Sequence, residues 1–163
     1  EGRSVPKTDL DFWRNTMATN LDGAFLTIRE SLKGMTQCDW GRVITVASIA
    51  GLKGLKGAPA YSASKHGMIG LMRGLSEEYM GSDLTFNALC PGYVDTDIVT
   101  RNTQSIADRA GIAPEQAKQM MVKTNRHKRL ITSEEVAAMA GLLVGPNSGS
   151  LNGQTYEIAG GQM

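Results

Sequence analysis

The stretch GRVITVASIAG, residues 41–51, decides how this chain folds. Its part 42–47 is short, apolar and β-branched, which indicates a buried strand. Before it, apolar residues recur at three- and four-residue steps over 9–35, with Asp9 placed to cap a long helix. After it, a glycine-rich loop leads into a second helical pattern at about 61–79. A buried strand between two helices is typical of an α/β protein with a parallel sheet covered on both faces.

The remainder of the chain continues this alternation. Residues 84–90 form a second apolar strand that the turn signal Pro91-Gly92 ends, and 153–158 indicate a third. Thr132 and Glu135 fit a capping box that opens a helix. Residues 94–131 are polar and weakly patterned, as short helices over an opening would be.

Three strands make a thin sheet, and the pattern lacks a partner for one of them. The strand at 42–47 is apolar on both faces, as a central strand is, yet nothing upstream of it can pair with its other edge. Residues 1–163 therefore predict a single domain that holds only part of a doubly wound parallel sheet.

Composition excludes several classes of function. The net charge of +1 gives no reason to expect nucleic acid or a membrane surface as a partner. No apolar run approaches the roughly 18–20 residues that span a bilayer, and no signal peptide is visible. Cys38 and Cys90 have no metal or redox spacing, so we expect no metal and a reduced, cytoplasmic setting.

The pair Tyr61 and Lys65 carries the first sign of chemistry. Residues four apart lie on one face of a helix, so the ammonium can approach the phenol. A free tyrosine has a pKa near 10, and a neighbouring cation lowers it, which would make Tyr61 a general acid or base for a carbonyl or alcohol. Such a pair also occurs as ordinary helix surface chemistry.

Two further polar residues change that balance. Ser48 follows the strand at the carboxyl edge of the sheet, where open α/β folds bind ligands, and thirteen positions allow its hydroxyl to return over the start of the second helix. It could also simply cap backbone groups. Asn20 stands inside an apolar helical stripe, where it either holds a water against the second helix or is a satisfied core amide.

Together Asn20, Ser48, Tyr61 and Lys65 strongly resemble the catalytic tetrad of the short-chain dehydrogenases/reductases. The surrounding phrases NLDGAF, GRVITVASIAG, YSASKHGMIGL, LTFNALCPGYVDT and NGQTYEIAGG are similar too, in the family's order and spacing over essentially the whole chain. The resemblance implies a Rossmann-like fold and an NAD- or NADP-dependent enzyme that interconverts a secondary alcohol and a ketone, on a small or acyl substrate.

The resemblance also implies roles for individual residues. Tyr61 would give or take the proton, Lys65 would lower its pKa and bind the nicotinamide ribose, Ser48 would orient the substrate oxygen, and Asn20 would organise a proton-relay water. Pro91, Gly92, Val94 and Thr96 would contact the cofactor. Residues 98–130 resemble the family's substrate lid. The two long helices imply a homodimer or homotetramer.

One family feature is missing. The motif T-G-x-x-x-G-x-G, whose backbone approaches the pyrophosphate, does not occur here. Gly51, Gly54 and Gly57 spell G-x-x-G-x-x-G, but at the family's substrate-side loop, so we interpret them as structural. The chain thus resembles the C-terminal two-thirds of such an enzyme. It would be inactive alone, and an N-terminal fragment could complete it.

Two alternatives stay open. The chain could be a non-catalytic scaffold kept for oligomerisation through its long helices. It could also belong to an acyl-carrier-linked 3-oxoacyl reductase, for which Arg126, Lys128 and Arg129 are candidate docking cations. The run 125–129 is otherwise interpreted as a solvated turn.

Overall fold

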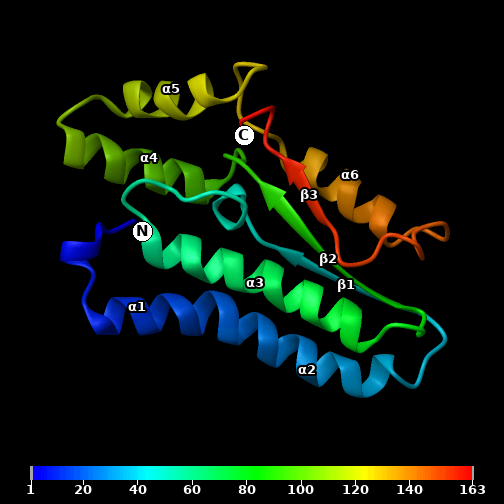
Figure 1. The fold of residues 1–163 in the computed structure, drawn as a ribbon. Helices are drawn as coiled ribbons and strands as arrows, with labels where there is room; N and C mark the ends of the chain where they lie inside the picture. The colour runs from blue at the N-terminus through cyan, green and yellow to red at the C-terminus, as the bar shows by residue number, and fades with distance from the viewer. Residues whose placement is uncertain (1, 163) are drawn as a thin grey trace.

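The computed structural model describes residues 2–162, apart from the side chain of residue 109. Three parallel strands form one sheet in the order β1-β2-β3 (Figure 1). They are β1 Gly41–Val46, β2 Leu84–Pro91 and β3 Thr155–Ile158. The helices α2 Gly23–Met35 and α3 Pro59–Glu78 cover one face, and α6 Ser133–Leu143 covers the other. The predicted α/β fold with a parallel, doubly covered sheet is confirmed.

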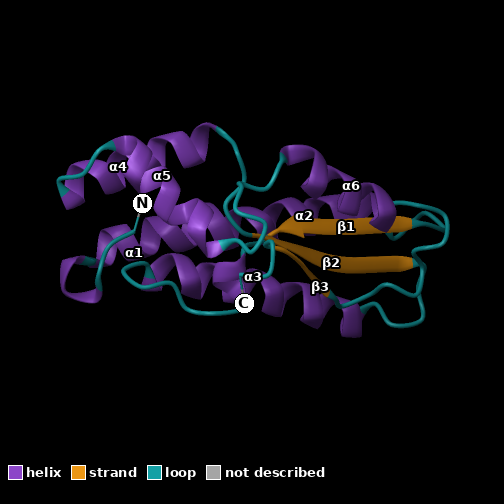
Figure 2. Cartoon of the chain, turned by 90° about the horizontal axis from the view of Figure 1, so that it is seen from above, coloured by secondary structure: helices purple, strands orange, loops and turns teal. Residues whose placement is uncertain are grey.

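All three strands point their carboxyl ends the same way. Figure 2 shows the strands directed toward the side of the molecule that holds α4 (Asp97–Ala110) and α5 (Pro114–Thr124). The segment 94–131 therefore forms helices beyond the carboxyl edge of the sheet, as expected. Loops that follow β1 and β2 open beneath them, which brings Ser48 and Gly92 to one edge.

The first predicted helix is continuous but not uniform. It comprises α1 (Leu10–Met17), a π-helical turn (Ala18–Asp22) and α2. Asp9 caps it as predicted, because its Oδ1 accepts a hydrogen bond of 2.7 Å from the Phe12 amide. The π-helical turn contains Asn20, and such turns occur frequently at functional sites.

The core lies between β2 and the two long helices. Every residue of β2 is buried, and its Phe86 packs with Ile28, Met68 and Met72. On the opposite face, the predicted capping box of α6 is present: Thr132 accepts from the Glu135 amide, and the Glu135 carboxylate accepts from the Thr132 amide.

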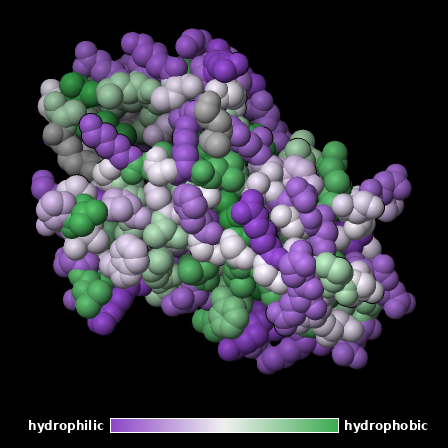
Figure 3. Space-filling model, in the orientation of Figure 1, coloured by the Kyte–Doolittle hydropathy of each residue, from purple (hydrophilic) through white to green (hydrophobic). Residues whose placement is uncertain are grey.

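The outer face of α1 and α2 exposes large apolar side chains. Trp13, Phe25 and Leu26 are 36%, 46% and 45% exposed. In Figure 3, green side chains interrupt purple ones along the lower part of the molecule, where these helices run.

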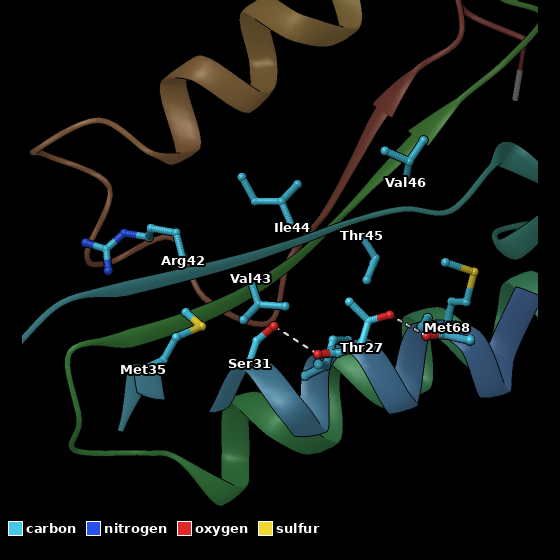
Figure 4. Close-up of a pocket in the computed structure, with 12 residues that line it drawn as sticks. Thr27, Ser31, Met35, Arg42, Val43, Ile44, Thr45, Val46 and Met68 are labelled. Atoms are coloured by element: carbon cyan, nitrogen blue, oxygen red, sulfur yellow. Dashed lines mark hydrogen bonds between the residues drawn. The ribbon is translucent and has the colours of Figure 1, made fainter. Parts of the chain in front are cut away.

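The outer edge of β1 is open. Within the described residues β1 pairs only with β2, although the sequence has the apolar pattern of a central strand. A groove of about 440 Å³ lies between β1 and α2. Figure 4 shows Val43 and Thr45 directed toward α2, whose Thr27 and Ser31 hydroxyls bond their own helix. The Thr45 hydroxyl is buried with no hydrogen-bond partner among residues 2–162, and Val46 is 55% exposed. The expected unpaired edge is confirmed.

Candidate active site

Ser48 and Tyr61 meet at the carboxyl edge of the sheet. Ser48 follows β1 and begins a short 3-10 turn, where its hydroxyl accepts a 3.1 Å bond from the Ala50 amide. The same hydroxyl is hydrogen-bonded to the phenol of Tyr61, which stands in the first turn of α3. Ser48 therefore caps backbone, as one interpretation predicts, and its hydroxyl also reaches the start of α3. Its role toward a substrate oxygen stays a prediction.

Lys65 lies one helical turn beyond Tyr61. Its Nζ donates a 3.0 Å hydrogen bond to the Val46 carbonyl and lies 5.7 Å from the centroid of the Tyr61 ring. Burial lowers the pKa of Lys65, because a desolvated ammonium is disfavoured. The predicted proximity of the pair is thus found, with the ammonium over the face of the ring.

The pKa of Tyr61 shifts in the direction opposite to the sequence-based expectation. Burial of the phenol raises its pKa, the bond to Ser48 acts in the lowering direction, and the nearby Tyr93 raises it further. Lys65 is not among these influences. The physical reason is that desolvation penalises the phenolate, while the ammonium is bonded to the Val46 carbonyl instead of the phenol.

Asn20 is hydrogen-bonded to α3, the helix that carries Tyr61 and Lys65. Its Nδ2 donates to the Ser64 hydroxyl at 3.0 Å, and that hydroxyl donates to the Tyr61 carbonyl at 2.8 Å. Ser64 is fully buried and was missed by sequence reasoning, since a serine inside YSASKHG carries no signal of its own. Gly67 makes the approach possible: a Cβ there would lie 2.8 Å from a Leu21 methyl of the π-helical turn.

The residues predicted to contact a cofactor lie along the loop that follows β2. Pro91 is the last residue of β2, and the Gly92 amide donates to Ile158 at 2.9 Å. Val94 bridges to Ile131, and the exposed Thr96 stands at the N-cap of α4, its hydroxyl 3.3 Å from the Val94 carbonyl.

Residues packed around position 92 favour a glycine there. A Cβ would meet Gln162 Oε1 at 2.9 Å, Ile131 at 3.2 Å and Ala159 at 3.3 Å. Packing against the C-terminal turn therefore favours glycine here, although the nearest of these atoms ends a flexible side chain that could move aside.

The three glycines of the loop after Ser48 differ from one another. A Cβ on Gly51 would lie 2.7 Å from the Lys65 carbonyl oxygen, whereas one on Gly54 would meet nothing within 4 Å. Gly57 has a φ of 74°, a conformation that favours glycine. Gly51 thus lets the Ser48 turn pack on α3, as expected of a structural glycine.

Two residues at this edge had no sequence signal. Lys53 Nζ donates to the Gln162 carbonyl at 2.5 Å, and Gln162 Nε2 donates to the Thr124 hydroxyl at 2.8 Å. Gln162 thus connects the loop after Ser48 with the end of α5. The two contacts join residues 109 and 38 positions apart, which local patterns do not reveal.

Among the proposed docking cations, Arg129 is already paired. Its guanidinium makes two 2.7 Å bonds to the Glu135 carboxylate, which holds the pKa of Glu135 at about 2. Lys128 Nζ bonds the Lys123 carbonyl, and Arg126 packs on Gly161. The run is not one uniform patch.

These arrangements agree with what comparison with known proteins finds. The sequence model of the short chain dehydrogenases matches residues 2–107, and the chain belongs to that family. It contains, across the residues described, no helix long and apolar enough to cross a membrane. Nor do these residues hold a group of three or more His, Cys, Asp or Glu side chains suited to a metal ion.

Individual relatives are considerably longer than this chain. This chain is 37% identical over 150 residues to the D-beta-hydroxybutyrate dehydrogenase of Rhizobium meliloti (strain 1021). The aligned part covers 91% of this chain and 58% of that protein. The chain is 32% identical to the 3-oxoacyl-acyl-carrier-protein reductase FabG of Pseudomonas aeruginosa, covering 93% of the chain and 57% of that protein. A variant of the actinorhodin polyketide ketoreductase, in a crystal structure with NADPH, superimposes with a TM-score of 0.94 at 31% identity, covering 99% of this chain and 62% of that one.

Proposed function

We propose that this chain forms the catalytic and substrate-binding part of an NAD(P)-dependent oxidoreductase that interconverts a secondary alcohol and a ketone. The observation that carries the proposal is the placement of the Tyr61 phenol, bonded to Ser48 and faced by the Lys65 ammonium, at the carboxyl edge of a parallel sheet. Similarity to a hydroxybutyrate dehydrogenase and to ketoacyl reductases supports the same reaction.

In this proposal Tyr61 transfers the proton. During reduction the phenol donates to the developing alkoxide oxygen, and Ser48 orients that oxygen by hydrogen bonding to it. Burial raises the pKa of Tyr61, so the phenol keeps its proton at neutral pH and has one to donate, although the same shift makes it a weaker acid. In the reverse direction it takes a proton from the alcohol. Asn20 holds the start of α3 through Ser64, which fixes the direction of the phenol.

The loop after β2 fits a nicotinamide cofactor. The Val94 amide makes no hydrogen bond within the described part of the chain, and the Thr96 side chain makes no bond to its own helix at the N-cap of α4. A helix N-terminus and free amides suit a phosphate or carboxamide. We propose that Pro91, Gly92, Val94 and Thr96 hold the cofactor there, with Lys65 on its ribose. NAD(P) would supply or accept the hydride.

The helices α4 and α5 form the proposed substrate lid, within residues 98–130. Val99, Met121 and Leu130 build a small apolar cluster of their own, against which Tyr93 packs. Since Tyr93 also lies close to Tyr61, the cluster connects the lid with the catalytic phenol. An acyl chain of the substrate would lie between these two surfaces.

We propose that a further segment carries the remainder of the cofactor site and adds a strand to the open edge of β1. The chain spans 57–62% of the length of the relatives reported above, and the glycine-rich pyrophosphate motif lies outside its sequence. A strand added to β1 would cover the groove against α2 and the partnerless Thr45 hydroxyl. Activity is therefore expected of the longer protein and not of residues 1–163 alone.

The exposed face of α1 and α2 favours self-association. Trp13, Phe25 and Leu26 lie on it, and such apolar side chains on helices often mark an interface. We propose a homodimer or homotetramer built on this face, to be measured by light scattering after size exclusion. The same face would serve a non-catalytic scaffold, so it does not separate the two readings of the chain.

Turnover separates an enzyme from a scaffold. The full-length protein is assayed for ketone-dependent oxidation of NADH and NADPH, as wild type, Tyr61→Phe and Tyr79→Phe. General acid catalysis contributes about 10²–10⁴-fold, so Tyr61→Phe should lose that much in kcat. Tyr79→Phe removes the same atom at the far end of α3 and should change nothing, since its ring keeps its contact with Phe86. A wild type without turnover on ketones of any size would favour the scaffold.

A further inference from the structure

The C-terminal turn gathers cations from two distant segments. Lys53 reaches it from the loop after Ser48 and bonds the Gln162 carbonyl. Arg126 reaches it from the connection between α5 and α6: its amide donates to the Gly160 carbonyl at 2.8 Å, and its side chain packs on Gly161. Figure 1 shows the chain end beside the loop that follows α5, at the carboxyl end of the strands.

Lys53 and Arg126 stand apart from the ion pairs that residues 2–162 form. No ion pair among the described residues includes Lys53 or Arg126, whereas the neighbouring Arg129 is fully engaged by Glu135. Lys53 is half-buried, so its ammonium has lost part of its hydration, and no carboxylate among residues 2–162 pairs with it. Within these residues it bonds one carbonyl, which leaves two of its three protons for a ligand.

Lys53 is also connected to the candidate active site through its own turn. The Lys53 amide donates to the Ile49 carbonyl at 3.0 Å, so Lys53 belongs to the same turn that Ser48 begins. Gln162, which holds the ammonium, packs with its Oε1 against Gly92 of the proposed cofactor loop. A ligand whose oxygen is bonded by Ser48 thus has Lys53 on the same turn.

We propose that Lys53, with Arg126 beside it, binds an anionic group of the substrate, a carboxylate or a phosphate carried at a short distance from the reacting carbonyl. The assignment rests on the proposed oxidoreductase function and names its substrate class. The Gln162 carbonyl holds the ammonium in place before the ligand arrives, which reduces the entropy lost on binding. Of the candidate docking cations Arg126, Lys128 and Arg129, this proposal keeps Arg126 and adds Lys53.

The test compares substrates that differ in charge. Full-length wild type, Lys53→Met and Lys53→Arg are assayed with acetoacetate, with its neutral ethyl ester, and with acetoacetyl-CoA. A hydrogen-bonded charge pair is worth about tenfold to a hundredfold in binding. We expect Lys53→Met to raise KM for acetoacetate by that factor with kcat unchanged, to leave the ester unaffected, and Lys53→Arg to restore most of the loss.

Lys56→Met provides the matched control. Lys56 lies three positions away in the same loop and is exposed, so its removal should leave every KM unchanged. A rise in KM for acetoacetyl-CoA alone would assign the cations to the distant phosphates of CoA and would refute an anion held close to the reacting carbonyl. An equal loss for acid and ester, or no loss for any substrate, would refute the proposal, since the first would show only that Lys53 supports the turn.

A binding measurement separates this proposal from the proposed reaction. Titration calorimetry with 3-hydroxybutyrate and with inorganic phosphate needs no turnover, so it reports on the subsite even if no ketone is reduced. Weaker binding in Lys53→Met, without turnover in the wild type, would keep the anion site and reject the reaction. Unchanged binding in Lys53→Met, together with ketone reduction by the wild type, would keep the reaction and reject the anion site.

Discussion

The substitution Gly51→Ala tests how the serine is held against the catalytic helix. A Cβ at position 51 would lie 2.7 Å from the Lys65 carbonyl oxygen and 2.9 Å from its carbonyl carbon. Ordinary contact begins at 3.4 Å, so the turn must move by 3.4 − 2.7, or about 0.7 Å. The obstacle is helix backbone, which cannot rotate away as a side chain would.

The expected cost follows from that overlap. Overpacking by one carbon costs about 1–3 kcal/mol, and replacing glycine returns at most about 1 kcal/mol through the unfolded chain. We therefore expect Gly51→Ala to lower the free energy of unfolding by about 1–2 kcal/mol. Because the turn carries Ser48, a displacement approaching 1 Å should also reduce kcat by about tenfold to a hundredfold.

Gly54→Ala is the control, since its Cβ would meet nothing within 4 Å. Both variants of the full-length protein are unfolded in urea and assayed for kcat. Gly54→Ala should match or exceed wild-type stability and keep its kcat. If Gly51→Ala behaved in the same way, the close contact between the turn and α3 would not exist in solution.

Three further results are expected. Ser48→Ala removes the bond that lowers the pKa of the buried Tyr61, so the ascending limb of kcat against pH for alcohol oxidation, in which Tyr61 is the proposed base, should move to higher pH; an unmoved limb would contradict the bond. Asn20→Ala leaves the buried Ser64 hydroxyl without its donor and should lower the free energy of unfolding, measured in urea, by about 1 kcal/mol. An unchanged free energy would show that the Asn20 amide is not bonded to Ser64. The pKa of Glu135, held near 2 by Arg129, lies below its ordinary 4.5, so its contribution to stability is complete above pH 4.5 and disappears as the pH falls toward 2. The free energy of unfolding of Glu135→Gln should therefore be lower than that of the wild type above pH 4.5, and the two values should converge as the pH falls toward 2.

Much of the fold could be predicted because its signals are local. The capping box at Thr132 and Glu135 lies within one helical turn, and Asp9 caps within three residues. Strands that are parallel must end at one edge, so Ser48 after β1 and Gly92 after β2 could be brought together without knowing any side-chain contact.

What could not be predicted depends on contacts between distant segments. The pKa of Tyr61 depends on how deeply the phenol is buried, which the spacing to Lys65 does not contain. The π-helical turn that carries Asn20 arises where the first helix packs on α3, and its sequence has no marker for it. Lys53 bonds the main-chain carbonyl of Gln162, and because every residue has such a carbonyl, the sequence gives no sign of the contact.

The position of Lys65 connects the open edge of the sheet with the chemistry. The Gly41 and Ala47 amides both donate toward β2, and because strand residues alternate, the carbonyl of Val46 points to the free edge. Lys65 bonds that carbonyl at 3.0 Å, so its ammonium already occupies the last acceptor of the edge. A strand added beside β1 would therefore have to end before Val46 or displace the ammonium. Lys65 thus lies on the boundary between the two parts of the proposed cofactor site, and completing the sheet would fix β1 and with it the acceptor that positions the lysine beside Tyr61.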